Sequence, residues 1–227
     1  MKVLVIAAHP DDEALGCGGT ITRHVAAGDA VAVVFLTDGV ASRLGGETGT
    51  VATERRYRAM HEARDMLGVH RTITVAHFQA YDNTLDTEAL LNVVQELEPV
   101  VADERPDIVY THHGGDLNID HRIVHQATLT ALRPQPGSSV KAIYAYEVPS
   151  STEWASDTLP AFRPNHFVDI SGFMEQKLAA LQAYEEEMRP FPHPRSIEAV
   201  KALAAWRGAS VGLPAAEAFM TVRSIQA

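Results

Sequence analysis

Val3-Leu-Val-Ile-Ala-Ala8, followed at once by His9-Pro-Asp-Asp-Glu13, is the stretch that decides the fold. A continuous run of aliphatic and β-branched residues is typical of a strand buried on both faces, as in a parallel sheet. Polar residues directly after such a strand lie at its carboxyl end, where open α/β sheets bind their ligands. This stretch therefore predicts both a buried parallel strand and a candidate functional loop.

Apolar strands alternate with amphipathic segments as far as residue 148. Strands are expected at residues 3–8, 30–36, 72–78, 107–110 and 141–146. Helices are expected at residues 13–27, 54–67, 86–104 and 120–132, with a Gly- and Ser-rich loop at 37–50. This alternation predicts an α/β fold with a mainly parallel sheet, right-handed crossovers and flanking helices.

Beyond residue 148 the pattern is weaker. We expect a strand at 167–170, helices at 172–188 and 197–208, and between these helices a proline-rich segment at 189–195. The apolar segment 211–219 can pack on the core or on another subunit, which leaves a homo-oligomer open. We interpret residues 1–227 as one domain, in which a less regular C-terminal lobe at 149–227 completes the site of a core at 1–148.

Charge and composition narrow the classes of partner. The net charge of −10 argues against nucleic acid and against an anionic membrane surface, because both require clustered Lys and Arg. Cys17 is the single cysteine of the sequence, so neither a disulfide framework nor a cysteine zinc site is expected. No apolar run is long enough to span a bilayer, and residues 1–8 lack the features of a signal peptide. We expect a cytoplasmic protein that acts on a small molecule.

Two polar clusters follow two of the expected strands. His9-Pro-Asp-Asp-Glu13 follows the first strand, and Asp116-Leu-Asn-Ile-Asp-His-Arg122 follows the fourth. In the doubly wound order 2-1-3-4-5, the switch point lies beside the first strand. If the fourth expected strand is the other neighbour of the first, the two clusters face each other at that point.

His9, Asp12 and His121 together offer two imidazoles and one carboxylate. A catalytic zinc takes three such ligands and keeps a position for water, and non-haem Fe(II) uses the same set. The alternative is that the acidic residues only cap helices and that the histidines are incidental. We prefer this alternative for the nearby histidines His112, His113 and His125.

The two clusters, in this order and context, resemble the PIG-L/LmbE-like N-acetylglucosaminyl deacetylase family. The resemblance extends to Gly16-Cys-Gly-Gly19, Leu36-Thr-Asp-Gly39 and the helix from Glu54 to Gly68. It implies a Rossmann-like fold and hydrolysis of the N-acetyl amide of a glucosamine-containing compound. It also implies that His9, Asp12 and His121 bind zinc, although the sequence leaves Fe²⁺ or another divalent metal open.

By the same resemblance Asp11 is the general base, which takes a proton from the attacking water while the metal polarises the acetyl carbonyl. Asp120 matches a carboxylate of the family and is expected to orient a neighbouring group. Many members have His-Pro-Asp-His, whose first histidine assists the transition state, where this chain has Asn118. Asparagine can donate a hydrogen bond but carries no titratable proton, so the proton donor must be another group or Asp11 itself.

Other residues carry weaker signals. The resemblance implies that Arg55 reaches the substrate, and Asp82 suits either a turn or a sugar hydroxyl. We expect the proline-rich segment to bring His193 and Arg195 over the site, with His193 as the proton donor and Asn118 and Arg195 as substrate contacts; a rigid surface connector is the alternative. The glycines of 16–19 are expected to allow close helix packing.

Two other functions are compatible with the same residues. An iron-dependent oxygenase would use the same three ligands but gives Asp11 no role. A Rossmann-like protein that binds a sugar or nucleotide without catalysis would use the acidic motifs only as helix caps. The compound attached to the acetylated sugar is not identified by these residues.

Overall fold

The computed structural model describes residues 1–41 and 49–226 and contains one seven-stranded sheet of order β3-β2-β1-β4-β5-β7-β6. Strands β1 to β5 are parallel, and β7 is antiparallel to both of its neighbours. The strands are β1 (Lys2–Ala7), β2 (Ala30–Phe35), β3 (Arg71–Thr74), β4 (Ile108–His112), β5 (Ala142–Tyr146), β6 (His166–Asp169) and β7 (Ala216–Ser224). The expected α/β fold with a mainly parallel sheet is confirmed.

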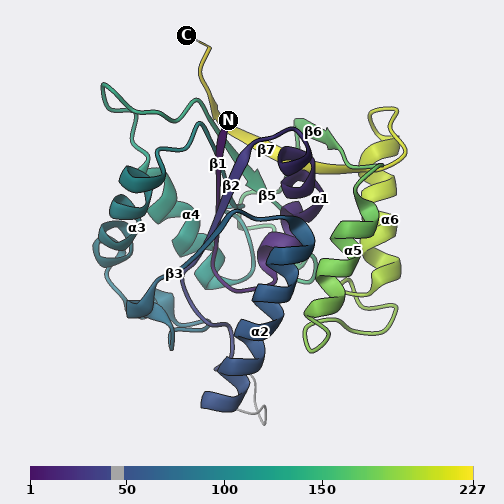
Figure 1. The fold of residues 1–227 in the computed structure, drawn as a ribbon, viewed down its shortest axis with the longest axis horizontal. Coiled ribbons are helices and arrows are strands. Elements are labelled where there is room, and N and C mark those ends of the chain that lie inside the picture. The colour runs from purple at the N-terminus through teal and green to yellow at the C-terminus, as the bar shows by residue number, and fades with distance from the viewer. Residues whose placement is uncertain (42–48, 227) are drawn as a thin grey trace.

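Helices cover both faces of the sheet, α3 and α4 on one face and α1, α2 and α5 on the other (Figure 1). The helices are α1 (Asp12–Ala26), α2 (Thr50–Leu67), α3 (Leu90–Glu104), α4 (Ile119–Ala131), α5 (Met174–Ala183) and α6 (Ile197–Ala209). Within residues 1–41 and 49–226, no helix combines the length and the apolar character that crossing a bilayer requires.

β1 lies inside the sheet and is buried on both faces. Val3, Val5 and Ala7 pack in the core beneath α1, α2 and α5, whereas Leu4 and Ile6 pack in the core beneath α3 and α4. β4 pairs with β1 on the side opposite β2, so the loops after β1 and β4 leave the sheet side by side. The order of the first five strands is therefore 3-2-1-4-5 and not 2-1-3-4-5, but the switch point lies beside β1, as expected.

α1 is broken at Cys17, and a buried ion pair caps both sides of the break. The ammonium of Lys177 on α5 donates to the carbonyl of Leu15 at 2.8 Å. The carboxylate of Glu217 on β7 accepts from the backbone N–H of Gly19 at 2.9 Å and from that of the next residue at 2.7 Å. The two charges are 2.5 Å apart, so each open helix end gains a partner while the pair compensates its own burial.

Strand β7 is absent from the expected elements. The second half of the apolar segment 211–219 lies in β7, which pairs with both β5 and β6, whereas Val211 at its start is 43% exposed. A charge at Glu217 interrupts the apolar pattern and hides the strand, since its partner Lys177 is remote in sequence. The C-terminal part of the chain is therefore more regular than expected.

Two expected elements are shorter than predicted. The strand expected at 72–78 ends at Thr74, and a 3-10 turn at Ala76–Phe78 then carries Phe78 into the core. The helix expected at 86–104 begins at Leu90, because a 3-10 turn at Leu85–Thr87 precedes it.

One further helix is shorter than expected, and one expected loop is described only in part. The helix expected at 172–188 spans only Met174–Ala183. The loop expected at 37–50 falls partly on residues 42–48, which lie outside the described residues.

Two glycines of the 16–19 motif lie where a side chain would clash. A Cβ atom on Gly16 would lie 2.3 Å from the ring of Tyr146, and one on Gly19 would lie 2.8 Å from the side chain of Ile170. The expectation that these glycines permit close helix packing is confirmed.

We expect Gly16→Ala to lower the free energy of unfolding by about 1–3 kcal/mol, the usual cost of overpacking a core. Tyr146 is fully buried and its hydroxyl donates to the carbonyl of Ile6 at 2.9 Å, so its ring has little room to move. The control is Gly172→Ala, whose Cβ would meet no atom within 4 Å and should change stability by less than about 0.5 kcal/mol. Urea unfolding of both variants measures the difference, and equal stabilities would contradict it.

Candidate metal centre

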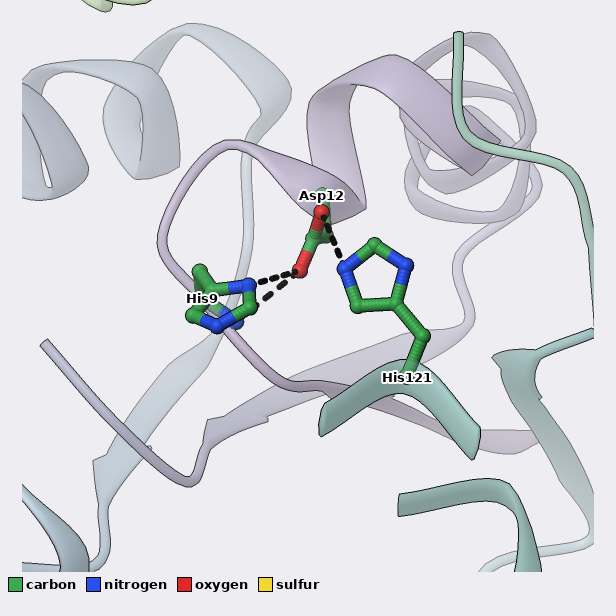
Figure 2. Close-up of side chains that lie close together, drawn as sticks. All are labelled: His9, Asp12 and His121. Atoms are coloured by element: carbon green, nitrogen blue, oxygen red, sulfur yellow. Dashed lines mark hydrogen bonds and ion pairs between the residues drawn. The ribbon is translucent and has the colours of Figure 1, made fainter. Parts of the chain in front are cut away.

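Asp12 lies between two histidine rings at the carboxyl ends of β1 and β4 (Figure 2). Its Oδ2 is 3.2 Å from Nδ1 of His9, and its Oδ1 is 3.3 Å from Nε2 of His121. One ligand atom from each of the three residues lies within 4.8 Å of the others, and the three side chains are buried. The structure thus brings together the three residues that the sequence predicts as metal ligands.

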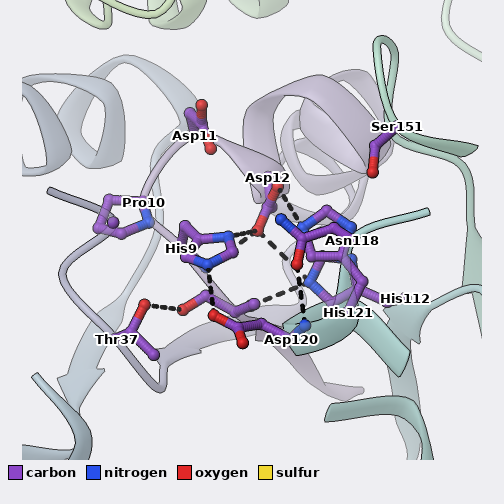
Figure 3. A network of polar contacts seen from close by, with 12 residues as sticks. His9, Pro10, Asp11, Asp12, Thr37, His112, Asn118, Asp120, His121 and Ser151 are labelled. Atoms are coloured by element: carbon purple, nitrogen blue, oxygen red, sulfur yellow. Dashed lines mark hydrogen bonds and ion pairs between the residues drawn. The ribbon is translucent and has the colours of Figure 1, made fainter. Parts of the chain in front are cut away.

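Carboxylates from a single segment lie beside the far nitrogens of both rings, and Figure 3 shows Asp120 beside His9. Nε2 of His9 is hydrogen-bonded to Oδ2 of Asp120 at 3.0 Å, and Nδ1 of His121 lies 3.1 Å from Oδ1 of Asp116. Carboxylate partners of this kind orient a histidine and strengthen it as a metal ligand. The inner nitrogens are thereby left facing Asp12.

Asp116 is itself held by the loop that follows β5. It accepts hydrogen bonds from the hydroxyls of Ser151 and Thr152, the latter at 2.6 Å. Burial opposes its ionisation, but His121 and the two hydroxyls outweigh burial and lower the pKa of Asp116 below its usual range. Asp116 therefore stays a carboxylate and links the β5 loop to His121.

Asp120 in turn fixes the loop that carries Asp82. Its two oxygens accept the backbone N–H groups of Asn83 at 2.6 Å and Leu85 at 2.9 Å. Oδ1 of Asp82 consequently lies 3.4 Å from Nε2 of His9. Asp82 is thus at the site, and with His9 and Asp120 it forms a second group of metal-ligand type that shares His9 with the first.

The geometry of the first group fits a metal ion. Among the described residues, Oδ1 of Asp12 and Nε2 of His121 are buried without a hydrogen-bond partner, which is costly unless something else satisfies them. Imidazole nitrogens and a carboxylate oxygen are ligands that zinc takes in proteins. Asp12 faces both rings, with Oδ2 3.2 Å from His9 and Oδ1 3.3 Å from His121.

The electrostatics of the group also favour a cation. Burial lowers the pKa of His121, but the carboxylates of Asp12 and Asp116 outweigh burial and raise it to about 9. Burial likewise opposes protonation of His9, yet Asp12 and Asp120 raise its pKa well above the ordinary value. A site that draws protons onto two buried imidazoles has a strongly negative potential, which a divalent cation would also balance.

Asp11 stands beside this group in a strained backbone conformation. Its φ of 127° is rare for a residue with a Cβ, and such strain concentrates at functional sites. Its Oδ2 accepts a hydrogen bond from Nη1 of Arg195 at 2.7 Å. Burial raises the pKa of Asp11, and the guanidinium of Arg195 offsets part of that rise.

A known protein family matches the part of the chain that contains both polar clusters. Residues 4–132 match the PIG-L family, described as GlcNAc-PI de-N-acetylase, and this match covers more than half of the sequence. The chain belongs to the PIG-L family.

Its relatives include deacetylases. The uncharacterized deacetylase YaiS of Escherichia coli K12 is 33% identical over 192 residues, which cover 81% of this chain and 90% of the relative. The diacetylchitobiose deacetylase of Thermococcus kodakarensis is 30% identical over 82% of this chain and 70% of its own length.

A solved structure with the same fold is named as a hydratase and not as a deacetylase. The 4-carboxy-2-hydroxymuconate hydratase GalB of Pseudomonas putida KT2440 superposes with a TM-score of 0.75 at 24% identity, over all of this chain and 98% of the other. This likeness shows the fold alone, so the PIG-L fold is compatible with more than one named activity.

The proline-rich segment meets the site of this PIG-L protein through Arg195. Besides its bond to Asp11, Arg195 donates through Nε to Oγ of Ser150 at 2.7 Å. Nδ1 of His193 accepts from the backbone N–H of Arg195 at 3.1 Å, and the His193 ring lies edge-on to Trp154, with centroids 5.6 Å apart. The segment therefore places Arg195 on Asp11 and His193 against Trp154.

Helix α2 presents Arg56 to Asp11. Nη1 of Arg56 donates to the carbonyl of Pro10 at 2.7 Å and lies 4.0 Å from Oδ2 of Asp11. Arg55 is paired with Glu186 at 3.0 Å and lines a cavity of about 240 Å³ between α2 and residues 183–187. Arg56 could have been found from the 3.6-residue period, because it falls on the buried face of α2 with the apolar residues Ala52, Met60, Ala63 and Leu67.

Asn118 is the N-cap of α4. Its side-chain oxygen accepts the backbone N–H of Asp120 at 2.8 Å, which is the usual task of asparagine at this position. The oxygen thereby helps to place both Asp120 and His121 on the first turn of the helix.

Sequence reasoning missed two groups that support the site. His112 is fully buried, accepts the backbone N–H of Ala8 at 2.9 Å and stacks on His121 with ring centroids 3.9 Å apart. Its position at the end of β4 was the available signal. Glu13 accepts from the hydroxyl of Tyr184 at 2.7 Å, and burial raises its pKa to about 8.

Proposed function

We propose that this chain is a zinc-dependent N-deacetylase that hydrolyses the N-acetyl amide of a small amino-sugar compound and releases acetate and a free amine. The observation that carries the proposal is the pair of unpartnered, buried ligand atoms on Asp12 and His121, with the carboxylate of Asp11 in the adjoining residue. The relatives named as deacetylases at 30% identity or above favour this activity over that of the hydratase, which is related at 24%.

His9, Asp12 and His121 would hold the metal, and Asp116 and Asp120 would keep the two imidazoles turned toward it. When bound, a zinc ion supplies a Lewis acid that draws charge from an acetyl carbonyl. Fe²⁺ or another divalent ion could use the same ligands. An iron-dependent oxygenase would need no base at Asp11, whereas amide hydrolysis does.

Asp11 would take the proton from the attacking water. Its contact with Arg195 at 2.7 Å and the strained φ of 127° hold the carboxylate in one orientation, which suits a general base. The same proton, or one from a second group, must then reach the nitrogen of the amide, because an amine leaves readily only when it is protonated.

His193 is our candidate for the second group. The oxygen of Asn118 is engaged as a helix cap, and its amide nitrogen can bind substrate but holds no titratable proton. His193 lies two residues from Arg195 on the segment that contacts Asp11, and imidazole exchanges protons near neutral pH. We assign it the protonation of the leaving amine.

The remaining predicted residues would contact the substrate. Asp82 would accept a hydrogen bond from a sugar hydroxyl, and Asn118 would donate one. Arg195 already holds Asp11, so it would bind substrate only through the edge of its guanidinium that Asp11 does not occupy. Arg55 lines the cavity beside Glu186, and its contact with the substrate stays a prediction. The cytoplasm, with a supply of small acetylated amino sugars, is our proposed compartment.

His121→Ala should abolish tight binding of zinc, because it removes one of the three ligands. The matched control is His77→Ala, which removes a histidine whose side chain is 52% exposed. Elemental analysis after dialysis measures the metal retained by each protein. Full occupancy in His121→Ala would remove His121 from the ligand set.

Asp11→Asn should retain the metal but lose ~10²–10⁴ in kcat, because the amide has nearly the same shape yet cannot accept the proton. Asn also tolerates the positive φ, so the backbone should keep its conformation. Asp12→Asn should instead lose the metal. Acetate release from N-acetylated glucosamine compounds, read beside metal content, separates the two effects, and the reverse pattern would exchange the roles of the two aspartates.

His193→Gln should lower the maximal rate with metal content unchanged. Burial lowers the pKa of His193, and the cations Arg195 and Arg189 lower it further. A proton donor works in its protonated form, so its contribution is present at low pH and is lost as the pH rises through this lowered pKa, below the usual ~6.5. The alkaline limb of the pH–rate profile should therefore flatten in the variant. A wild-type rate and profile would leave Asp11 as both base and acid.

A further inference from the structure

We call His9, Asp12 and His121 the ligand group. Three large apolar side chains are exposed on loops near it. Leu117 is 48%, Trp154 is 51% and Phe191 is 65% exposed. They lie on the loop after β4, on the loop after β5 and on the proline-rich segment, respectively. Exposed apolar side chains beside a few convergent polar groups are typical of ligand-binding sites. Trp154 has the largest flat face of the three.

The loop of Trp154 is anchored on the ligand group. Trp154 ends a 3-10 turn that begins at Thr152, and the hydroxyl of Thr152 donates to Asp116 at 2.6 Å. Asp116 in turn lies 3.1 Å from His121. The backbone N–H of Leu117 also donates to the carbonyl of Ser151 at 3.4 Å, so the two loops are joined at this point as well.

The proline-rich segment closes this loop from the other side. His193 meets Trp154 with an angle of 84° between the ring planes, so an edge contact supports the indole. Arg195 binds Ser150 on the same loop as Trp154 and Asp11 beside the ligand group. The loop of Trp154 is therefore tied to both Asp116 and Arg195, while half of the Trp154 surface is open.

We infer that Trp154 is a stacking platform for a second sugar ring, joined to the ring whose acetamide is hydrolysed; this inference rests on the proposed deacetylase function. A pyranose has a face of C–H groups that packs well on an aromatic ring. The groups next to the ligands, Asp82 and Asn118, are polar and match the hydroxyls of the reacting ring. Trp154 is two residues beyond Thr152, whose hydroxyl binds Asp116, and we place the next ring of a linked substrate against it.

The first test compares a linked substrate with a single ring. In Trp154→Ala, the ratio of kcat/KM for N,N′-diacetylchitobiose to kcat/KM for N-acetylglucosamine should fall about tenfold, the upper range for an aromatic contact. Trp154→Phe should restore most of the ratio. The control is Trp206→Ala, which removes the other tryptophan, 68% exposed on α6, and should leave the ratio unchanged.

An unchanged ratio in Trp154→Ala would overturn the platform. An equal loss for both substrates would also overturn it, because that result means that Trp154 only supports His193 or the fold of the loop. The inference requires a loss that grows when the second ring is present.

The second test measures binding without turnover. In Trp206→Phe, Trp154 is the only tryptophan of the sequence, and its fluorescence should change saturably with the β-1,4-linked glucosamine disaccharide but not with glucosamine. Trp154→Phe, which keeps only Trp206, should give no response. No change in the first protein would refute the platform. If neither acetylated sugar releases acetate, the deacetylase proposal fails while this fluorescence result still decides the platform.

Discussion

A carboxylate with no exposed surface is the constraint on which the rest of the structure depends. Asp12 is 0% exposed, and an uncompensated charge there would be prohibitive. Three features balance the charge of Asp12. Asp12 is the first residue of α1 and lies at the positive end of the helix, it accepts the backbone N–H of His9 at 2.9 Å, and it lies beside the imidazole of His121. Only a sheet that places β4 directly beside β1 can bring His121 to it.

The outer carboxylates extend this arrangement to the surrounding loops. Asp116 and Asp120 come from one short segment, yet each holds a different histidine and a different loop. Asp116 binds the loop after β5, and Asp120 binds the turns after β3. The ligand group is thus a junction at which four connections of the sheet meet, those after β1, β3, β4 and β5. This explains why polar residues from remote parts of the chain share one small buried volume.

Much of this could be predicted from the sequence, and the failures have physical causes. The strand at 3–8 and the ligand set of His9, Asp12 and His121 follow from an uninterrupted apolar run and from residue types at strand ends. β7 was not predicted, because the buried charge of Glu217 is compensated by Lys177, a residue remote in sequence that the local pattern does not show. Arg56 was missed, although the helical period places it on the buried face of α2.

The capped break in α1 has a consequence for how the molecule folds and opens. Gly19 donates to a residue 198 positions later, and β7 lies in the interior of the sheet although it is the last strand along the chain. The sheet therefore cannot be assembled in the order of the sequence, and contacts of such long range slow folding. Detachment of β7 in the native protein would also bare the amides of Gly19 and Thr20, so their hydrogen exchange would report the local opening of the C-terminal strand.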